Sequence, residues 1–243
     1  RRAPCRAIAC GALLLAGVVS TAAAQAPTPI AIDDPSWHLE SSHDGITLYG
    51  SAVPGTGIVP VKAVMTVPGT IEDVSLVLED IPRRREWVSN LGRSVLLKRA
   101  NDYDQTEYMR VDVPWPASDR SAIIRARVSV SDDLARATIA AQSVDVSAPD
   151  SLPALVRARV YASTFQMTQV GDHVEVVALV FIDPCGSIPK WIVNYFTRRV
   201  ARATLRGLRR QVARRLYSPA QIAAMHHRMV AFRAFRERGA AVP

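Results

Sequence analysis

The sequence has few cysteines and no metal-binding pattern of histidines. Two of its three cysteines, Cys5 and Cys10, lie near the start of the chain, and Cys185 has no partner for an internal disulfide. The five histidines form neither H-E-x-x-H nor another metal-ligand spacing. The sequence therefore predicts neither a disulfide framework nor a metal site, and we expect no cofactor.

Catalytic motifs are missing as well. No G-x-S-x-G nucleophile motif is present, and no histidine or asparagine can be placed beside Cys185 to activate its thiol. Gly55 and Gly57 stand without the other residues of a glycine-rich phosphate loop. We therefore interpret Cys185 as a small residue of a turn, and the sequence offers no motif for nucleophilic catalysis.

A long apolar run is also lacking near the N-terminus. The apolar stretch Ile8–Val19 is shorter than the roughly 20 residues of a membrane-spanning helix. It lies between a basic segment and Ala22-Ala23-Ala24, which has the form of a cleavage site. We therefore predict a signal peptide over residues 1–24, an extended leader over 25–35, and export to the periplasm or the medium.

The positive charge of the chain is concentrated towards its C-terminus. The formal net charge is +8, yet residues 25–189 hold 14 basic and 21 acidic side chains. Residues 190–243 hold 13 basic side chains and one acidic side chain. This asymmetry is typical of one element that touches an anionic surface, and equally of a solvated helix face.

Short apolar runs alternate with turn residues from 37 to 182, which predicts antiparallel strands. Thr70, followed three residues later by Asp73, predicts the start of a helix among them. Residues 189–216 predict a long amphipathic helix, and a shorter helix follows in the tail, residues 218–243. The arginines that lie off the apolar stripe of the long helix are Arg198, Arg202, Arg206, Arg209 and Arg210.

Three short motifs stand in order along this pattern. Trp37 precedes Asp44-Gly45-Ile46-x-x-Tyr49, residues 114–120 read PWPASDR, and residues 183–194 read DPCGSIPKWIVN. Together they resemble motifs of the START lipid-transfer family, although Ser121 replaces the aspartate that the family often has there. The resemblance implies a START-like lipid-binding domain over residues 36–217. Its expected fold is α+β helix-grip, in which a curved antiparallel β-sheet wraps around a long C-terminal helix and encloses a hydrophobic cavity.

The resemblance also implies that one lipid molecule occupies this cavity. Alternation along the predicted strands places Glu107, Met109 and Val111 on one face, and small residues such as Ala126 leave room inside. The residues expected to line the lipid cavity are Trp87, Glu107, Met109, Val111, Ile124, Ala126, Val128, Ile192, Phe196 and Val200. The five arginines named above are expected to contact an anionic membrane surface transiently.

Sterol-binding members of the family pair a buried acid with an arginine on a neighbouring strand. Glu107 matches the acid by position, whereas Ala126 stands where the arginine would be. The run of three arginines at residues 83–85 is interpreted as a solvated face. The sequence thus predicts either a cavity with one acid and no arginine, suited to a single hydroxyl group, or a Glu107 that lies in water at a strand end.

These observations favour a monomeric, non-catalytic carrier that binds a sterol, phospholipid or fatty-acid-like lipid and transfers it between membranes. One alternative is a cyclase-like enzyme for a hydrophobic cyclic substrate, with Glu107 and either Thr164 or Tyr161 in its cavity. Another is an envelope-associated interaction module that docks through its basic helix. Nucleic acid is not expected as a partner, because no stacking aromatic residues accompany the arginines.

Overall fold

A computed structural model describes residues 27–115, 117–149, 152 and 155–240, and a ten-stranded sheet dominates this part of the chain. The strands are β1 (His38–His43), β2 (Ile46–Gly50), β3 (Val61–Pro68), β4 (Leu91–Asn101), β5 (Asp104–Val111), β6 (Arg120–Val130), β7 (Arg136–Ser143), β8 (Val156–Arg157), β9 (Arg159–Val170) and β10 (His173–Asp183). Their order is β1-β2-β3-β10-β9-β7-β6-β5-β4 with antiparallel neighbours, and the short β8 pairs parallel with β6. The predicted signal peptide, residues 1–24, lies outside the described residues.

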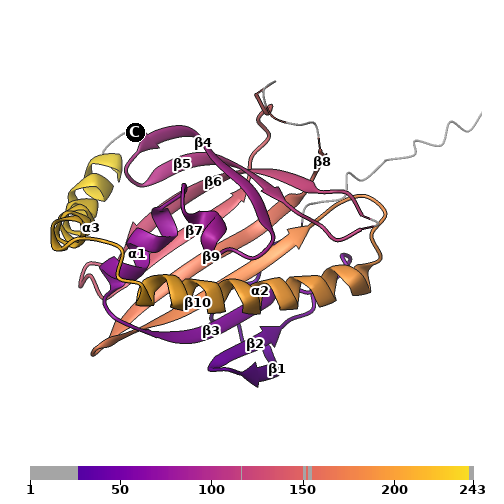
Figure 1. The fold of residues 1–243 in the computed structure, drawn as a ribbon, viewed down its shortest axis with the longest axis horizontal. Coiled ribbons are helices and arrows are strands. Elements are labelled where there is room, and N and C mark those ends of the chain that lie inside the picture. Colours follow the sequence, from indigo (N-terminus) through magenta and orange to yellow (C-terminus); the bar gives the residue numbers. More distant parts are fainter. Residues whose placement is uncertain (1–26, 116, 150–151, 153–154, 241–243) are drawn as a thin grey trace, which may run out of the picture.

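Four helical segments accompany the sheet. They are α1 (Ile71–Glu79), the 3-10 helix η1 (Arg84–Glu86), α2 (Lys190–Ala213) and α3 (Pro219–Ala240). At 1.5 Å per residue, α2 is about 36 Å long, and it runs across one face of the curved sheet (Figure 1). This arrangement confirms the predicted helix-grip fold. Within the described residues, no helix has the length and apolar character needed to cross a membrane.

Local sequence explains several of these boundaries. Asp44 and Gly45 have φ angles of 56° and 67°, which the tight turn between β1 and β2 requires. The Thr70 side chain accepts a hydrogen bond from the Asp73 amide, and the Asp73 side chain bonds back to the Thr70 amide. This is the predicted capping box, and it supplies partners for orphan amides where α1 begins. Buried and less buried residues alternate along β3, so one face of this strand belongs to the core.

The main hydrophobic core lies between the helices and the sheet. Its fully buried members include Met65 and Met167 from the strands and Leu205 and Leu208 from α2. Two smaller clusters cover the opposite face of the sheet. One places Ile32 of the leader and Trp37, just before β1, against Phe181, and the other places Leu152 against Tyr108 and Ile123. Apolar clusters therefore pack on both faces of the sheet.

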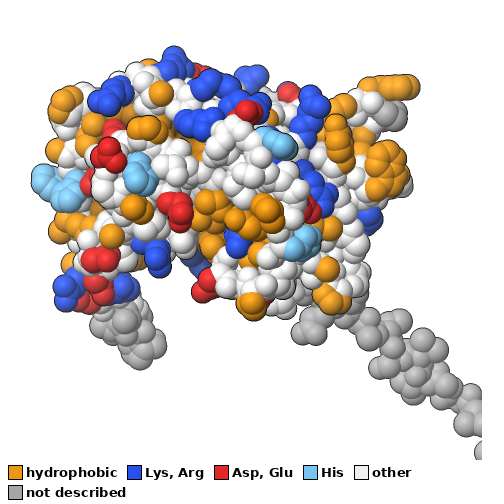
Figure 2. Space-filling view, turned by 90° about the horizontal axis from the view of Figure 1, so that it is seen from below, with side chains coloured by type: hydrophobic (Ala, Val, Ile, Leu, Met, Phe, Trp, Pro, Cys, Tyr) orange, Lys and Arg blue, Asp and Glu red, His pale blue; other side chains and the backbone are white. Residues whose placement is uncertain are grey.

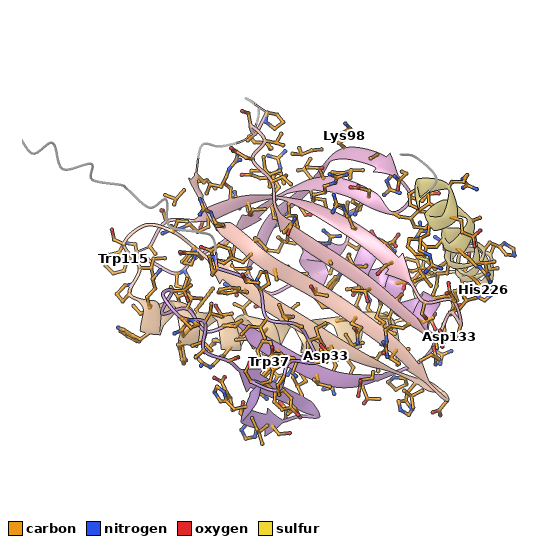
Figure 3. The ribbon with its side chains drawn as sticks, turned by 180° about the vertical axis from the view of Figure 1, so that it is seen from behind. Asp33, Trp37, Lys98, Trp115, Asp133 and His226 are labelled. Atoms are coloured by element: carbon orange, nitrogen blue, oxygen red, sulfur yellow. The ribbon has the colours of Figure 1, made fainter. Side chains whose placement is uncertain are left out.

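The helix α3 packs on α1 and on one end of the sheet. Its apolar contacts come from Met225, Met229 and Phe232, and the Phe232 ring packs edge-on against Tyr103 with centroids 5.0 Å apart. The His226 Nδ1 atom lies 2.8 Å from Glu72 of α1, and Arg228 pairs with Glu79. Figure 3 shows that His226 and Trp115 lie at opposite ends of the molecule. The predicted C-terminal tail therefore contributes a helix that covers one end of the fold.

Candidate functional site

A cavity of about 780 Å³ lies between α2, the α1–η1 segment and the inner face of the sheet. Its wall includes all ten residues that the sequence assigned to a lipid cavity. Strands β6, β7, β9 and β10 contribute small side chains to the wall, namely Ala126, Ala141, Ser163 and Ala178. These short side chains leave volume that neighbouring residues do not fill, which is uncommon in a close-packed interior. The cavity therefore forms because small residues occupy several inward-facing positions of these strands.

One stretch of the wall is polar and centres on an ion pair between Arg84 and Glu107. Glu107 is 1% exposed, and its carboxylate accepts hydrogen bonds from Arg84 Nη1 and, at 2.7 Å, from Gln105 Nε2. Arg84 also donates from Nη2 to the Leu78 carbonyl at 2.9 Å. The acid and the base thus neutralise each other inside the wall. Both carboxylate oxygens of Glu107 therefore accept hydrogen bonds from neighbouring side chains.

This pair corrects two sequence predictions. Glu107 does not lie in water, and the cavity does contain an arginine. The arginine comes from η1 instead of the neighbouring strand, where Ala126 lines the wall as predicted. Within the run at 83–85, Arg84 is buried while Arg83 and Arg85 are exposed. The interpretation of the whole run as a solvated face was therefore wrong for its central residue.

Further ionisable groups lie on the side of the cavity that α3 covers. Burial raises the pKa of the Glu79 carboxyl above its usual value, although the neighbouring Arg228 acts in the opposite direction. Burial also raises the pKa of the Tyr103 hydroxyl, which donates to the Arg228 carbonyl at 2.8 Å. On β5, hydrogen bonds from Arg125 lower the pKa of Asp104. Ionisable groups are thus concentrated at this end, and mostly apolar side chains with a few serine and threonine residues line the wall between it and Arg120 at the other end.

Two hydroxyl groups suggested for an enzymatic cavity lie elsewhere. Neither Tyr161 nor Thr164 belongs to the cavity wall, whereas Ser163 and Phe165 do. A register shift between β9 and β10 places Phe181 opposite Ala162 and Ile182 opposite Val160, so Tyr161 is the extra residue of a bulge. The Tyr161 ring packs against Phe181 in the cluster on the opposite face of the sheet. The bulge explains why simple alternation fails for this residue.

At the other end, the cavity reaches the protein surface between the β5–β6 loop and the start of α2. Arg120 joins these two segments: its Nε donates to the Pro184 carbonyl at 2.8 Å, and its Nη1 donates to Ser118 Oγ at 3.0 Å. Arg120 lies in the second sequence motif and Pro184 in the third, so the structure brings both motifs together at the cavity mouth. The extended segment from Glu107 on β5 to Val113 just beyond it spans about 20 Å at the usual strand rise. The polar pair therefore lies deep inside.

The start of α2 is held in place by its own sequence motif. Asn194 accepts a hydrogen bond from the Val59 amide at 2.9 Å and donates to the Gly57 carbonyl at 3.1 Å. Pro189 precedes the first helical residue with φ at −55° and also lines the cavity. The turn before it contains Cys185 and Gly186, which have φ angles of 55° and 73°. This junction fixes the angle at which α2 leaves the sheet and covers the cavity.

Replacing Pro189 by alanine should increase the dissociation rate of a bound ligand more than it lowers global stability. The proline ring restricts the unfolded chain, so its loss should reduce the free energy of unfolding by only about 0.4–1 kcal/mol. The greater freedom before α2 acts directly on the mouth. Ligand release and urea unfolding, measured on the same preparation, check this. Equal release rates in variant and parent would show that the junction does not control the mouth.

The five arginines predicted to contact a membrane do not form one free cationic face. Arg198 forms a two-point ion pair with Glu40, and Arg206 pairs with Asp44. Arg202 donates to Ser41 Oγ at 2.6 Å and to the His43 carbonyl at 3.1 Å. The β1–β2 hairpin therefore engages three of the five. Among the described residues, no ion pair involves Arg209 or Arg210, and membrane contact by these two stays a prediction.

The described residues offer no obvious metal site. No group of three or more histidine, cysteine, aspartate or glutamate side chains comes together there as possible ligands. Cys185 is a half-buried free thiol in the turn before α2. The site thus offers a ligand an apolar cavity and one buried ion pair, Arg84–Glu107.

A cavity between a curved sheet and a helix that crosses it defines a helix-grip binding protein. The START domain profile matches residues 18–216, so the chain belongs to the START domain family. An uncharacterized protein of Pseudomonas aeruginosa is 26% identical over 180 residues, which cover 74% of this chain and 88% of that protein. The phosphatidylcholine transfer protein of Rattus norvegicus is 24% identical over 172 residues, which cover 68% and 78%.

Solved structures support the same assignment. A STAR-related lipid transfer protein from Xanthomonas axonopodis is 27% identical with a TM-score of 0.64, and the match covers 73% of this chain and 99% of that one. Human STARD10 is 22% identical with a TM-score of 0.65, and the match covers 84% and 82%. The likeness to STARD10 concerns the fold, since the identity is low.

Proposed function

We propose that this protein binds one amphipathic lipid in its cavity and transfers it between membranes without changing it chemically. The observation that carries the proposal is an apolar cavity of about 780 Å³ whose polar end is neutralised by the Arg84–Glu107 pair. Its volume lies within the usual range for ligand sites. With the predicted signal peptide over residues 1–24, the carrier would work in the periplasm or the medium.

The free energy of moving a lipid between bilayer and cavity favours a protein that can both take up and release its ligand. Each methylene removed from water contributes about 0.8 kcal/mol, but a lipid in a bilayer is already surrounded by hydrocarbon. Exchange between bilayer and cavity is therefore nearly balanced for the apolar part of the ligand. The polar end of the cavity then decides which lipid is held. No catalytic step is part of the proposal, because both oxygens of Glu107 are occupied by Arg84 and Gln105.

The polar end favours a lipid whose head carries no net charge. An anionic head would compete with Glu107 for Arg84, and separating the pair would leave a buried carboxylate without its partner. A hydroxyl or an ester avoids this cost, and a zwitterionic head brings a cation for Glu107 together with its anion for Arg84. The rat relative is named for the transfer of phosphatidylcholine, which supports a phospholipid as the ligand.

The direct test is to extract the purified protein with organic solvent and to identify bound lipid by mass spectrometry. We expect one lipid class at close to one molecule per chain. Vesicle-to-vesicle transfer of that lipid should then be accelerated by the protein. An empty cavity that takes up no sterol, phospholipid or fatty acid would refute the proposal.

A tryptophan placed at Ala141 should exclude the lipid. Ala141 lines the cavity, whereas Ala140, its neighbour on β7, points to the opposite face and is exposed. Ala141→Trp should therefore lower the lipid content of the purified protein several-fold, and Ala140→Trp should leave it unchanged. Lipid extraction and thermal unfolding of both variants check this. Equal lipid content in the two folded variants would place the ligand outside this cavity.

A further inference from the structure

The rim of the cavity mouth exposes large aromatic side chains. Trp115, Trp191 and Tyr195 are 92%, 72% and 61% exposed. Trp115 belongs to the cavity wall, and so does Ile192, which is 37% exposed. Tryptophan is highly buried on average, so two such side chains at one opening indicate a surface that is covered when the protein works.

These side chains come from both sides of the mouth. Trp115 lies on the loop after β5, while Trp191 and Tyr195 lie one turn apart in the first part of α2. Ile192 and Phe196, each one position further along, line the cavity. The first turns of α2 thus present an aromatic stripe to the outside and an apolar stripe to the ligand. In Figure 2, hydrophobic side chains gather at the end of the molecule where α2 begins.

Several charges beside the rim are paired, whereas Arg199, one turn after Tyr195, is an exposed cation. Lys190 Nζ lies 3.6 Å from Asp183, and Asp119 lies 3.8 Å from Arg110 Nε. Further along α2, the β1–β2 hairpin engages Arg198, Arg202 and Arg206 through the contacts described above. Charge attraction is therefore not the principal source of binding that this end of the molecule offers. The rim instead offers amphipathic rings.

We propose that this aromatic rim, formed by Trp115, Trp191 and Tyr195, docks on the headgroup region of a lipid bilayer. Tryptophan and tyrosine concentrate at membrane interfaces, because each ring has an apolar body and a polar edge. A bilayer fits better than a protein partner, since the rim surrounds the opening of an apolar cavity. A lipid could then pass between bilayer and cavity without exposing its chains to water. This inference rests on the proposed lipid-carrier function.

The test uses the full chain and vesicles of phosphatidylcholine. Trp115→Ser/Trp191→Ser should weaken sedimentation with the vesicles by at least about tenfold. One tryptophan can bury about 200 Å², and a tenfold change needs only roughly 55 Å² at the usual transfer coefficient. Vesicles of brominated phosphatidylcholine should quench the tryptophan fluorescence of the parent. Binding should change little with added salt or with anionic lipid.

Leu39→Ser is the matched control, because Leu39 is 63% exposed on the edge strand β1, outside the cavity wall. It should bind vesicles like the parent. Unchanged binding of the double tryptophan variant would overturn the proposal. So would a larger loss in Arg199→Ser/Arg210→Ser, which removes two exposed cations of α2, or a collapse of binding in high salt. If the protein binds vesicles but its cavity proves empty, the docking proposal is supported and only the carrier function is refuted.

Discussion

Replacing Glu107 by alanine should lower the free energy of unfolding by about 3–5 kcal/mol, since the buried Arg84 loses its counter-charge. The loss combines an unpaired guanidinium with the broken hydrogen bond from Gln105. Urea denaturation of the lipid-free protein measures it. Asp104→Ala removes a partner of Arg125, which is far more exposed than Arg84. This control on the same strand should lose much less stability.

The double variant Arg84→Met/Glu107→Leu separates stability from ligand choice. Apolar residues of similar volume avoid the desolvation of both charges, so most of the lost stability should return. The variant should nevertheless change which lipid co-purifies, because the polar end is gone. We expect lipids with smaller polar heads. An unchanged lipid profile in a stable double variant would show that the pair serves the fold and takes no part in recognition.

Replacing Gly207 by alanine should destabilise the protein by about 1–3 kcal/mol, although alanine is normally favoured over glycine inside a helix by about 1 kcal/mol. A Cβ atom at Gly207 would lie 2.1 Å from the Trp87 carbonyl oxygen, and backbone cannot rotate away as a side chain can. Thr204, one turn earlier, accepts a hydrogen bond from the Ser89 amide at 3.1 Å. The added methyl group should therefore push α2 away from the segment after η1.

The same variant should also release its ligand faster, since Trp87 and α2 both line the cavity. Gly239→Ala serves as the control, because a Cβ there would meet no atom within 4 Å apart from the neighbouring backbone of its own helix. It should be neutral or slightly stabilising. Thermal unfolding and the rate of ligand release, measured on both variants, test the expected loss of stability and the faster release. A stabilising Gly207→Ala would mean that α2 can move away from Trp87 at no cost.

The inward face of the sheet could be predicted from the sequence because strand alternation has a period of two. That rule placed Glu107, Met109 and Val111 together, and all three line the cavity. It failed at Tyr161, where a bulge inserts one residue and turns the side chain to the other face. Nothing local in the sequence marks that bulge, which depends on how β9 pairs with β10.

The partner of Glu107 could not be predicted for a related reason. Arg83, Arg84 and Arg85 are identical in type and adjacent, so composition gives no reason to choose one of them. Only the path of η1 beneath α2 buries Arg84 and leaves its neighbours exposed. Likewise, the arginines of α2 looked free because their partners, Glu40 and Asp44, lie far away in the chain. Long-range pairing of charges leaves little trace in local patterns.

The pairing of β3 with β10 has a consequence for how the chain acquires its structure during synthesis. Strands β4 to β7 follow one another and can form from hairpins as the chain emerges. In the described sheet, its two parts join where Pro68 meets His173 and Val61 meets Val180, residues that lie 105 and 119 positions apart in the chain. Such distant pairing is slow, because the intervening segment must first be closed into a loop. α2 follows β10 directly, so the sheet and its covering helix are completed almost together, soon after β10 has been synthesised.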